Sequence, residues 1–427
     1  MKIKIGVLGA FRGIAMIKFL MKYQDAELVA VCDKFRPALD KVRATADSLG
    51  VKVELYEDFD KFLECDMDAV VLANYATEHA PFAIRCLNSG RHVMSEVLAV
   101  QTMAEAVQLV EAVEKSGKEY AYAENFCYFR SCMEMKLRYD RGDIGEFTYG
   151  EGEYVHDCSS RWPELTYGDP NHWRNHYYIN YYCSHALGPV MFITGARPKR
   201  IVGFENKPEE SMRCQGARCS GAGMVICQTD NGAIIKGVQG HLKRKNSNYW
   251  TSIYGTKGCM ESDRWGEKRT DMLHAYIEGP EYCKGDYEYY EPKRYIDTEL
   301  SRETTTHFGA DFYTGYFFLE KLMGREDGKY SLDVYRGLDM SLPGLLAQRS
   351  IMAGNQPMEF PDFKDPAVRD LYRNDHICVD PKIAGDSVIP SSSFPVKELT
   401  EEEYANIRKK WLELQAANAV TVSGSEK

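Results

Sequence analysis

The first 125 residues alternate apolar runs with segments of helical periodicity, and this alternation restricts the fold more than any other feature of the chain. KIKIGVLGA leads apolar residues into a glycine, and IAMIKFLMKY follows with apolar residues three and four apart. The runs ELVAVCD, AVVLAN, HVMSE and EYAYAEN continue the alternation. Such an order is typical of a parallel sheet covered by helices on both faces. We therefore predict a doubly wound α/β domain over residues 1–126.

The loops after the predicted strands are candidates for binding a dinucleotide. Ligands of such sheets bind beyond the carboxyl ends of the strands, and a Rossmann domain holds pyrophosphate at its first glycine-rich turn. Asp33 lies 20 residues after Gly13, where a carboxylate can accept hydrogen bonds from a ribose. A bare ribose suits that carboxylate, which favours NAD, whereas the nearby Arg36 leaves NADP open. The predicted cofactor-binding residues at this rim are Gly9, Phe11, Arg12, Gly13, Asp33, Asn74, Tyr75, Glu96 and Asn125.

The glycine loop itself departs from the usual fingerprint. Residues 9–13 read G-A-F-R-G, which is one residue shorter than G-x-G-x-x-G and has no middle glycine. That middle glycine lets the backbone approach the pyrophosphate. From the loop alone, a doubly wound domain without a dinucleotide stays open.

From Phe147 onward, period-two segments dominate. FTYGEGEYVHD, KRIVGFEN and MVICQTDNGAIIKGVQG are strand-like, and Asn231-Gly232 marks a hairpin turn, as does the stretch Thr256-Lys257-Gly258. We predict a second, α+β domain over residues 127–365 with a large open, mainly antiparallel sheet. Residues 366–427 are predicted to form a C-terminal extension with one docked helix.

Charge and cysteine content exclude several classes of protein. Acidic residues outnumber basic ones by 63 to 53, a net charge of -10 that argues against a nucleic-acid partner, and the short basic stretch HLKRK at 241–245 is assigned to a solvated loop. No apolar run approaches the roughly 20 residues that span a bilayer, and no signal segment opens the chain, so we expect a cytoplasmic protein without a membrane partner. Thirteen cysteines without a Cys-x-x-Cys pair predict neither a disulfide framework nor a metal site.

Histidines and tyrosines gather in one part of the second half. Four of the ten histidines fall within the 32 residues from Tyr154 to His185. Strand alternation puts Tyr154 and His156 on one face, and helical spacing puts Tyr182 and His185 on one side. Histidine, with an ordinary pKa of about 6.5, exchanges protons at neutral pH. The cluster is either an aromatic core or a reaction site.

Several motifs resemble the Gfo/Idh/MocA oxidoreductases over residues 1 to about 365. They are GVLGAFRG, Asp33, the segment 74–79, HVMSEVLA, AEN, THFGADF and PMEFPDF. Ordinary dehydrogenases of that superfamily carry Glu-Lys-Pro after the fifth strand and an Asp-x-x-x-His helix. Here the first reads Glu96-Val97-Leu98 and the second reads Tyr181-Tyr-Cys-Ser-His185. The resemblance adds His79 to the predicted cofactor-binding residues.

A subgroup of that superfamily is more similar still. Tyr154-Val-His156-Asp, His172-Trp-Arg174 and Tyr182-Cys-Ser-His185-Ala-Leu-Gly-Pro resemble, in order and type, the NAD-dependent α-N-acetylgalactosaminidase-like glycosidases, glycoside hydrolase family 109. Leu98 replaces a proline of that pattern, Cys183-Ser184 replaces Pro-Thr, and Ala186 replaces a glycine. These departures bear on the choice of sugar more than on the chemistry.

The resemblance implies a glycosidase that works through a redox cycle on a small carbohydrate or glycoside, with an N-acetylhexosamine as one candidate. Tightly bound, recycled NAD⁺ takes hydride from C3 of the sugar, a base removes the C2 proton, the aglycone is eliminated, water adds at C1, and the hydride returns. The implied catalytic residues are His185, Tyr182, His156 and Tyr154, and the implied substrate-binding residues are Arg174, Trp173 and Glu124. His172 and His176 match no subgroup position and are expected to be loop or surface residues. We also expect a homo-oligomer, a dimer or tetramer, because open sheets often bury a face against a second subunit.

Two other functions stay open. The first is an NAD-dependent sugar or glycoside 3-dehydrogenase, which shares the first step; the missing lysine after Glu96 weakens it. The second is a catalytically silent cofactor-sensing protein, which would tolerate the altered glycine loop. A sensor has no need for two acid-base pairs, so the His/Tyr set favours an enzyme.

Overall fold

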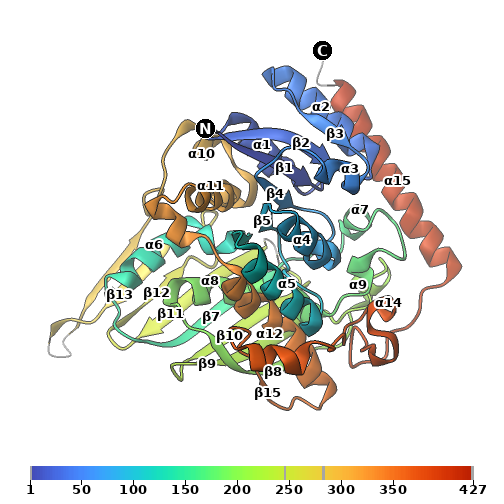
Figure 1. Cartoon of the computed structure of the whole chain (residues 1–427). Coiled ribbons are helices and arrows are strands. Elements are labelled where there is room, and N and C mark those ends of the chain that lie inside the picture. Colours follow the sequence, from blue (N-terminus) through green and yellow to red (C-terminus); the bar gives the residue numbers. More distant parts are fainter. Residues whose placement is uncertain (1, 245–246, 281–283, 425–427) are drawn as a thin grey trace.

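The computed structural model describes residues 2–424 except 245–246 and 281–283. Within these residues the chain forms two sheets, which Figure 1 shows as a blue N-terminal layer above a green and yellow sheet. The predicted fold class is confirmed. The predicted boundaries at residues 126 and 365 stay predictions.

The first sheet contains six parallel strands in the order β3-β2-β1-β4-β5-β6, the doubly wound arrangement. Its strands are β1 Ile3–Leu8, β2 Ala26–Cys32, β3 Glu54–Tyr56, β4 Ala69–Leu72, β5 His92–Ser95 and β6 Tyr120–Tyr122. The connecting helices are α1 Ile14–Lys22, α2 Arg36–Leu49, α3 Phe59–Leu63, η1 Ala76–Glu78, α4 His79–Asn88 and α5 Met103–Ser116. The Thr102 side chain accepts a hydrogen bond from Glu105 N at the start of α5, and Gly117 ends that helix in the left-handed region.

The second sheet contains nine strands in the order β14-β13-β12-β11-β7-β10-β9-β8-β15. Its strands are β7 Phe147–Val155, β8 Pro198–Glu205, β9 Ala222–Thr229, β10 Ile234–Gly240, β11 Asn248–Gly255, β12 Gly258–Ser262, β13 Leu273–Ile277, β14 Asp286–Tyr290 and β15 Met358–Glu359. Only β7 and β10 pair in parallel among these strands, and both predicted hairpins are present. The sheet is therefore large and mainly antiparallel, as expected.

Helices cover one face of this sheet and connect it to the first domain. α8 packs on β7, β10 and β11, while α12 packs on β8 and also against α5 and β6. The helices and turns of this half are η2 Asn125–Tyr128, α6 Arg130–Asp140, α7 Trp162–Leu165, η3 Trp173–Asn175, η4 Ile179–Tyr182, α8 Ser184–Thr194, α9 Glu210–Arg213, α10 Glu299–Glu303, η6 Thr306–Gly309, α11 Ala310–Leu322, η7 Glu326–Tyr330 and α12 Val334–Met352.

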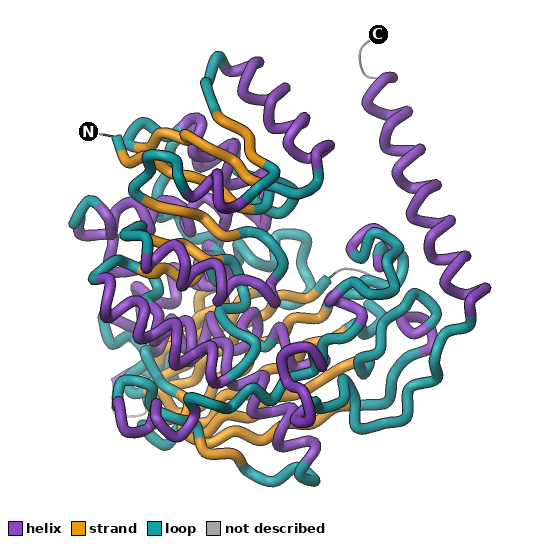
Figure 2. The backbone as a smooth tube through the Cα atoms, turned by 45° about the vertical axis from the view of Figure 1, so that its right-hand side comes forward, coloured by secondary structure: helices purple, strands orange, loops and turns teal. Residues whose placement is uncertain are grey.

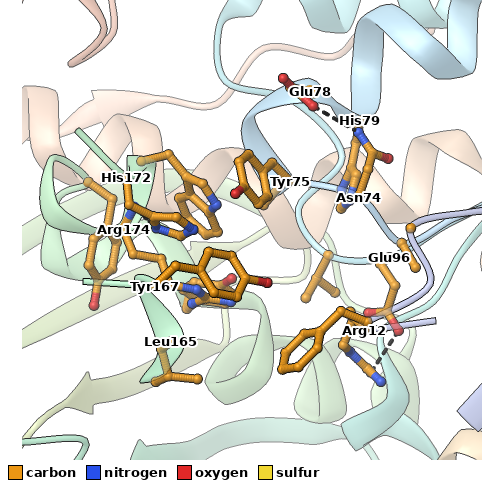
Figure 3. A pocket seen from close by; sticks show the side chains of 18 of the residues that line it. Arg12, Asn74, Tyr75, Glu78, His79, Glu96, Leu165, Tyr167, His172 and Arg174 are labelled. Carbon is orange, nitrogen blue, oxygen red and sulfur yellow. Dashed lines mark hydrogen bonds and ion pairs between the residues drawn. The ribbon is translucent and has the colours of Figure 1, made fainter. Parts of the chain in front are cut away.

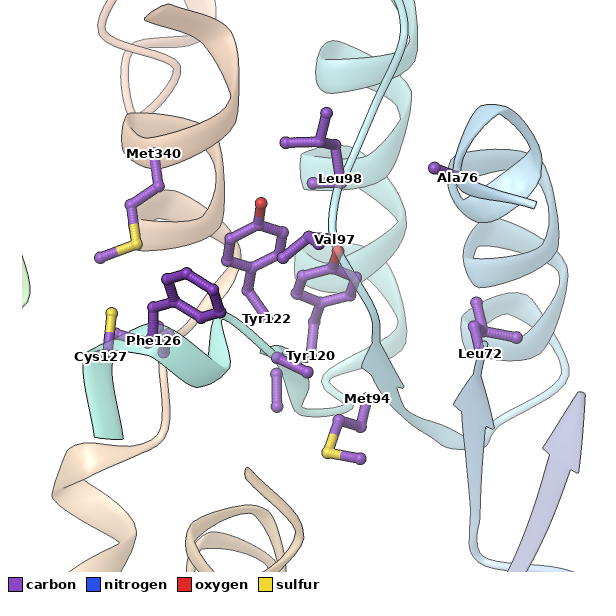
Figure 4. Packing of buried hydrophobic residues seen from close by; sticks show 14 of the residues in the cluster. Leu72, Ala76, Met94, Val97, Leu98, Tyr120, Tyr122, Phe126, Cys127 and Met340 are labelled. Carbon is purple, nitrogen blue, oxygen red and sulfur yellow. The ribbon is translucent and has the colours of Figure 1, made fainter. Parts of the chain in front are cut away.

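A continuous apolar core joins the two halves. Met340 of α12 lies beside Phe126 and Cys127 of η2 and near Tyr122 of β6, as Figure 4 shows. Burying one large apolar side chain contributes about 1.5–3 kcal/mol. The relative position of the two sheets, and of any site between them, is therefore fixed by packing.

The C-terminal extension contains three helices, α13 Pro366–Tyr372, α14 Pro381–Ala384 and α15 Glu401–Gly424, with a 3-10 turn, η8 Gly385–Ser387. α15 packs on α7 through its first half, with Ile407 buried, and then runs along the outside of the molecule (Figure 2). The sequence predicted one docked helix, and the shorter helices α13 and α14 were not expected. Among the described residues, no helix combines the length and the apolar character needed to cross a lipid bilayer.

Candidate active site

One cavity of about 650 Å³ lies between the carboxyl ends of the first sheet and the end of β7 in the second. It brings together fifteen of the predicted site residues: Gly9, Phe11, Arg12, Asp33, Asn74, Tyr75, His79, Glu96, Asn125, Tyr154, His156, Trp173, Arg174, Tyr182 and His185. Figure 3 shows rim residues such as Arg12 and Asn74 facing His172 and Arg174 across this space. Gly13 and Glu124 do not line the cavity.

The glycine loop and Asp33 form the dinucleotide end of the rim. Gly9 has a φ of 98°, and a side chain there would collide with the backbone of Ala73. Ala10 N donates to Asp33 Oδ2 over 2.7 Å, and Phe35 N donates to Asp33 Oδ1 over 2.8 Å. Each carboxylate oxygen keeps a second acceptor site. The carboxylate therefore ties the loop to β2 and can still accept a hydrogen bond from a ligand.

A buried ionic network stands at the centre of the rim. Arg12 lies 2.6 Å from Glu96 Oε1 and 3.5 Å from Asp311 Oδ1. Asn125 Nδ2 donates to Asp311 Oδ1 over 2.8 Å, and His307 Nδ1 lies 2.9 Å from Asp311 Oδ2. Burial acts to raise the pKa of Asp311, but the hydrogen bond from His307 and the charge of Arg12 outweigh it and hold that pKa well below its usual range. Asp311 lies in the THFGADF motif, and its role was not predicted.

His185 projects into the cavity from the first turn of α8. Its Nδ1 lies 2.7 Å from Oε1 of Glu124, a residue that is fully buried. Because a carboxylate only accepts hydrogen bonds, this contact assigns a proton to Nδ1 and leaves Nε2 free to accept one in the neutral ring. Phe126 stacks on the imidazole at 4.2 Å, and the Tyr154 ring meets it edge-on at 4.7 Å. Glu124 was predicted to contact substrate, but it lies behind His185.

A close approach between α8 and β7 fixes the position of His185. A side chain at Gly152 of β7 would collide with the backbone carbonyl of Ala186, the residue after His185. Tyr182 and His185 belong to two separate elements, η4 and α8, yet both side chains line the cavity. Tyr181 turns away and is buried in the core.

Tyr154 and His156 lie on either side of the end of β7. Their rings are 6.2 Å apart, and both line the cavity. The sequence predicted His156 to lie on this strand, but β7 ends at Val155 and His156 is the next residue; its backbone N donates to Gly240 O over 2.9 Å. Burial and the charge of Arg161 lower the pKa of His156, whereas burial raises the pKa of Tyr154 well above its ordinary value. Both side chains are therefore held neutral at neutral pH.

Arg174 supplies positive charge to this wall. Its guanidinium lies 4.5 Å from the Trp173 ring and 5.4 Å from the Tyr182 ring. Burial raises the pKa of Tyr182, and the adjacent Arg174 opposes that rise because it stabilises the phenolate. An arginine in this position can hold sugar hydroxyls or assist proton transfer by Tyr182.

Three histidines of the cavity wall, His172, His241 and His307, were not predicted as site residues. His172 was expected to be a loop or surface residue, but it is only 5% exposed and meets the Tyr75 ring at 4.9 Å. His241 was assigned to a solvated loop, but it is buried and its Nε2 lies 2.9 Å from Tyr177 OH; Lys245 of that stretch lies outside the described residues. Burial lowers the pKa of His172 to about 3 and that of His241 to about 4. Local periodicity gives no signal for His172 or His241, because both lie outside regular helices and strands.

Comparisons with known proteins agree with this arrangement. The model of an oxidoreductase family with an NAD-binding Rossmann fold matches residues 3–124, and that of the glycosyl hydrolase 109 C-terminal domain matches residues 224–368. Glycosyl hydrolase family 109 protein 2 of Bacteroides fragilis is 30% identical over 405 residues, covering 86% of this chain and 92% of the relative. A protein of the same description from Phocaeicola vulgatus is 24% identical over 399 residues, covering 84% of this chain and 94% of the relative.

Solved structures share the fold. An oxidoreductase from Agrobacterium radiobacter, in complex with NAD⁺, L-tartaric acid and magnesium, is similar with a TM-score of 0.68 at 15% identity, covering 84% of this chain and 98% of its own. The chain therefore belongs to glycosyl hydrolase family 109 and is an enzyme of the NAD-dependent Gfo/Idh/MocA type, a glycoside hydrolase or a related oxidoreductase.

Proposed function

We propose that this protein is an NAD-dependent glycosidase that cleaves a small glycoside through transient oxidation of its sugar. The observation that carries the proposal is the single cavity, which has a dinucleotide rim on one side and two His/Tyr pairs on the other. A sugar bound between them would lie within reach of both walls. The relatives described as glycosyl hydrolases support hydrolysis as the net reaction.

The residues at the rim fit a dinucleotide. Asn74 Oδ1, Asn125 Oδ1 and His79 Nε2 are buried and have no hydrogen-bond partner among the described residues, and all three side chains line the cavity. Burying such atoms unpaired is costly, so they suit a ligand that carries amide or hydroxyl groups. Gly9, Arg12 and Asp33 would lie along the pyrophosphate and ribose of the same ligand.

The choice of NAD over NADP rests on Asp33 and Arg36. A carboxylate accepts from a 2′-hydroxyl and repels a 2′-phosphate. Arg36, the residue that could bind such a phosphate, is engaged with Asp40 Oδ1 at 2.9 Å and Glu57 Oε1 at 3.2 Å. NAD therefore suits this end of the rim better.

The protein side chains would handle the protons of the reaction. When bound, NAD⁺ supplies a reversible hydride acceptor for a carbon of the sugar. His185 Nε2, with Nδ1 held by Glu124, is suited to remove the proton of the hydroxyl on that carbon. Tyr154 and His156 form the second pair, suited to remove the proton of the next carbon, which a neighbouring ketone makes acidic. Loss of that proton would form a C1=C2 double bond and expel the aglycone, which takes up a proton. Water would then add at C1, C2 would regain a proton, and the carbonyl carbon would recover its hydride.

Arg174 and Tyr182 complete the proposed wall. The cation stabilises an oxyanion that develops on the sugar, or a phenolate at Tyr182, because its charge lies in a buried site where electrostatic interactions are strong. Trp173 offers an aromatic face beside them for a sugar ring.

A panel of nitrophenyl glycosides tests the function, beginning with α-N-acetylgalactosaminide. Nitrophenol release and NADH absorbance are followed together in the purified holoenzyme. We expect nitrophenol to accumulate without net NADH. Steady NADH growth would favour a sugar 3-dehydrogenase, and silence on every glycoside with NAD bound would favour a cofactor-sensing protein.

A further inference from the structure

Aromatic side chains, two of them largely exposed, surround one end of the cavity. Phe11 and Phe35 are large apolar residues, yet 54% and 51% of their surfaces are exposed. Tyr167 lies between them, with ring centroids 6.0 Å from Phe11 and 6.5 Å from Phe35. All three line the cavity next to Asp33. Exposed aromatic groups at a cavity mouth are suited to stacking against the flat face of a ligand.

The backbone at Tyr167 is held in place by α15. Tyr167 has a φ of 54°, a conformation that costs a non-glycine residue free energy and persists where the surroundings hold it. Arg408 Nη1 of α15 donates to Tyr167 O over 3.0 Å. Gly168 lies so close to α15 that a Cβ there would be 2.9 Å from Trp411 Cβ and 3.1 Å from Arg408 Cα. α15 therefore braces the turn that carries Tyr167.

α15 also contributes directly to the cavity wall through Trp411. The guanidinium of Arg408 lies over the Trp411 ring, 4.3 Å from its centroid. The indole Nε1 of Trp411 is shielded from solvent and has no hydrogen-bond partner among the described residues. A buried donor on a cavity wall is suited to an acceptor atom of a ligand.

The helix is anchored before it reaches the cavity. Arg213 Nη2 lies 2.8 Å from Glu403 Oε1, and Ile407 is 5% exposed. Tyr167 and Trp411 both lie outside the segments 3–124 and 224–368 that the family models match. The two family models therefore do not cover this contact.

We propose that α15 and the turn at Tyr167 form a strap over the adenosine half of the dinucleotide and slow its release. The position follows from the neighbours of Tyr167: Phe11 lies in the pyrophosphate loop and Phe35 follows the ribose-binding Asp33. The inference rests on the proposed function, in which the hydride returns to the sugar, so the cofactor never has to exchange between turnovers. Slow release of NAD therefore does not limit the turnover rate.

The dissociation rate of NAD tests the strap. Full-length holoenzyme is mixed with excess labelled NAD, and loss of the original cofactor is followed by rapid gel filtration. Trp411→Ala is expected to release NAD on the order of tenfold faster than the wild type, since stacking on one aromatic group contributes about 1–3 kcal/mol. Trp411→Phe, which keeps a ring and loses the N–H, is expected to fall between them. Leu412→Ala, at a neighbouring exposed position on the same helix, is the matched control with the wild-type rate.

If Trp411→Ala fails to fold, Arg408→Ala provides a second test of the strap. Arg408 is exposed, and its loss frees Tyr167 without opening the core. We expect a smaller acceleration of release. Wild-type release rates in both Arg408→Ala and a folded Trp411 variant would overturn the strap, as would a wild type that does not retain NAD. If the variants release NAD faster but the wild type cleaves no glycoside, the strap is supported and the proposed glycosidase function is not. If the wild type cleaves glycosides but the variants release NAD at the wild-type rate, the glycosidase function is supported and the strap is not.

Discussion

The two walls of the cavity hold their polar groups differently. On the dinucleotide rim, Arg12 is paired with Glu96 and Asp311, so these charges are fixed in position. On the opposite wall, His185 is enclosed by Phe126, Tyr154 and Tyr182, while burial lowers the pKa of His172 and of His241. The difference fits the proposed function, in which the rim would orient a cofactor through paired charges and the His/Tyr side chains of the facing wall would exchange protons.

Replacing His185 should give the largest difference between the effect on glycoside cleavage and the effect on NAD binding. His185→Ala removes the proposed general base; such a group typically contributes about 10²–10⁴-fold, and the glycoside cleavage rate should fall by that factor. NAD affinity, measured by calorimetry, should stay near the wild-type value because the rim is untouched. His176→Ala is the matched control, since His176 does not line the cavity. A cleavage rate in His185→Ala equal to the wild type would remove its assigned role.

Glu124→Gln should give a smaller loss through the same imidazole. The variant keeps the shape of the side chain and removes the charge that holds His185 Nδ1. We expect kcat to fall about 10- to 100-fold with little change in KM, because outer partners of this kind orient a reacting group without touching substrate. Steady-state kinetics separates the two constants. A rise in KM at constant kcat would instead indicate direct contact between Glu124 and the sugar.

A fall in pH should destabilise the cavity wall that contains His241 before it changes the charges of the rim. The pKa of His241 is lowered by burial from an ordinary value of 6.5 to about 4, so between these two values the unfolded chain binds a proton that the folded chain does not. Stability is therefore lost as the pH falls from 6.5 toward 4. Asp311, whose pKa lies below its ordinary range, keeps its charge throughout that window.

Denaturant unfolding at pH 7 and pH 5 measures this effect. His241→Asn should reduce the loss of unfolding free energy between the two pH values by about 1–2 kcal/mol relative to the wild type. His376→Asn, at an exposed position, is the control. An identical pH dependence in His241→Asn and the wild type would show that His241 is not held neutral.

Asp33→Asn should have the smallest effect and should be confined to the rim. The backbone N–H groups of Ala10 and Phe35 then lose a charged acceptor, and the ribose loses a carboxylate. We expect NAD binding to weaken roughly tenfold, about 1.4 kcal/mol, while NADP binding weakens less. Arg36 is paired with Asp40 and Glu57 and is not available to a 2′-phosphate, so Arg36→Ala should leave both affinities unchanged. Calorimetric titration with both cofactors provides the comparison.

The rim could be predicted from sequence because strand order dictates it. Asp33, Asn74 and Glu96 each follow a parallel strand, and carboxyl ends of neighbouring parallel strands meet at one edge. The helix ends of this region, such as the Thr102 N-cap of α5, can also be recognised from the local sequence.

The facing wall could be predicted only in part. Residue spacing and the family resemblance together indicated Tyr154, Tyr182 and His185, whereas His172, His241 and Trp411 were not predicted. These residues reach the cavity from loops, turns and a helix far along the chain, and their positions depend on tertiary packing that no local periodicity encodes. The placement of Glu124 behind His185 likewise depends on the meeting of α8 with η2.

Hydrogen exchange with solvent tests the central claim most directly, because only the proposed route breaks a C–H bond at C2 with a protein base and restores it from water. A cleavable glycoside is incubated with the holoenzyme in D₂O, and the released sugar is analysed by NMR. We expect deuterium at C2 and retention of the original hydrogen at C3. A released sugar with no deuterium at C2 would contradict the redox route and leave direct hydrolysis in its place.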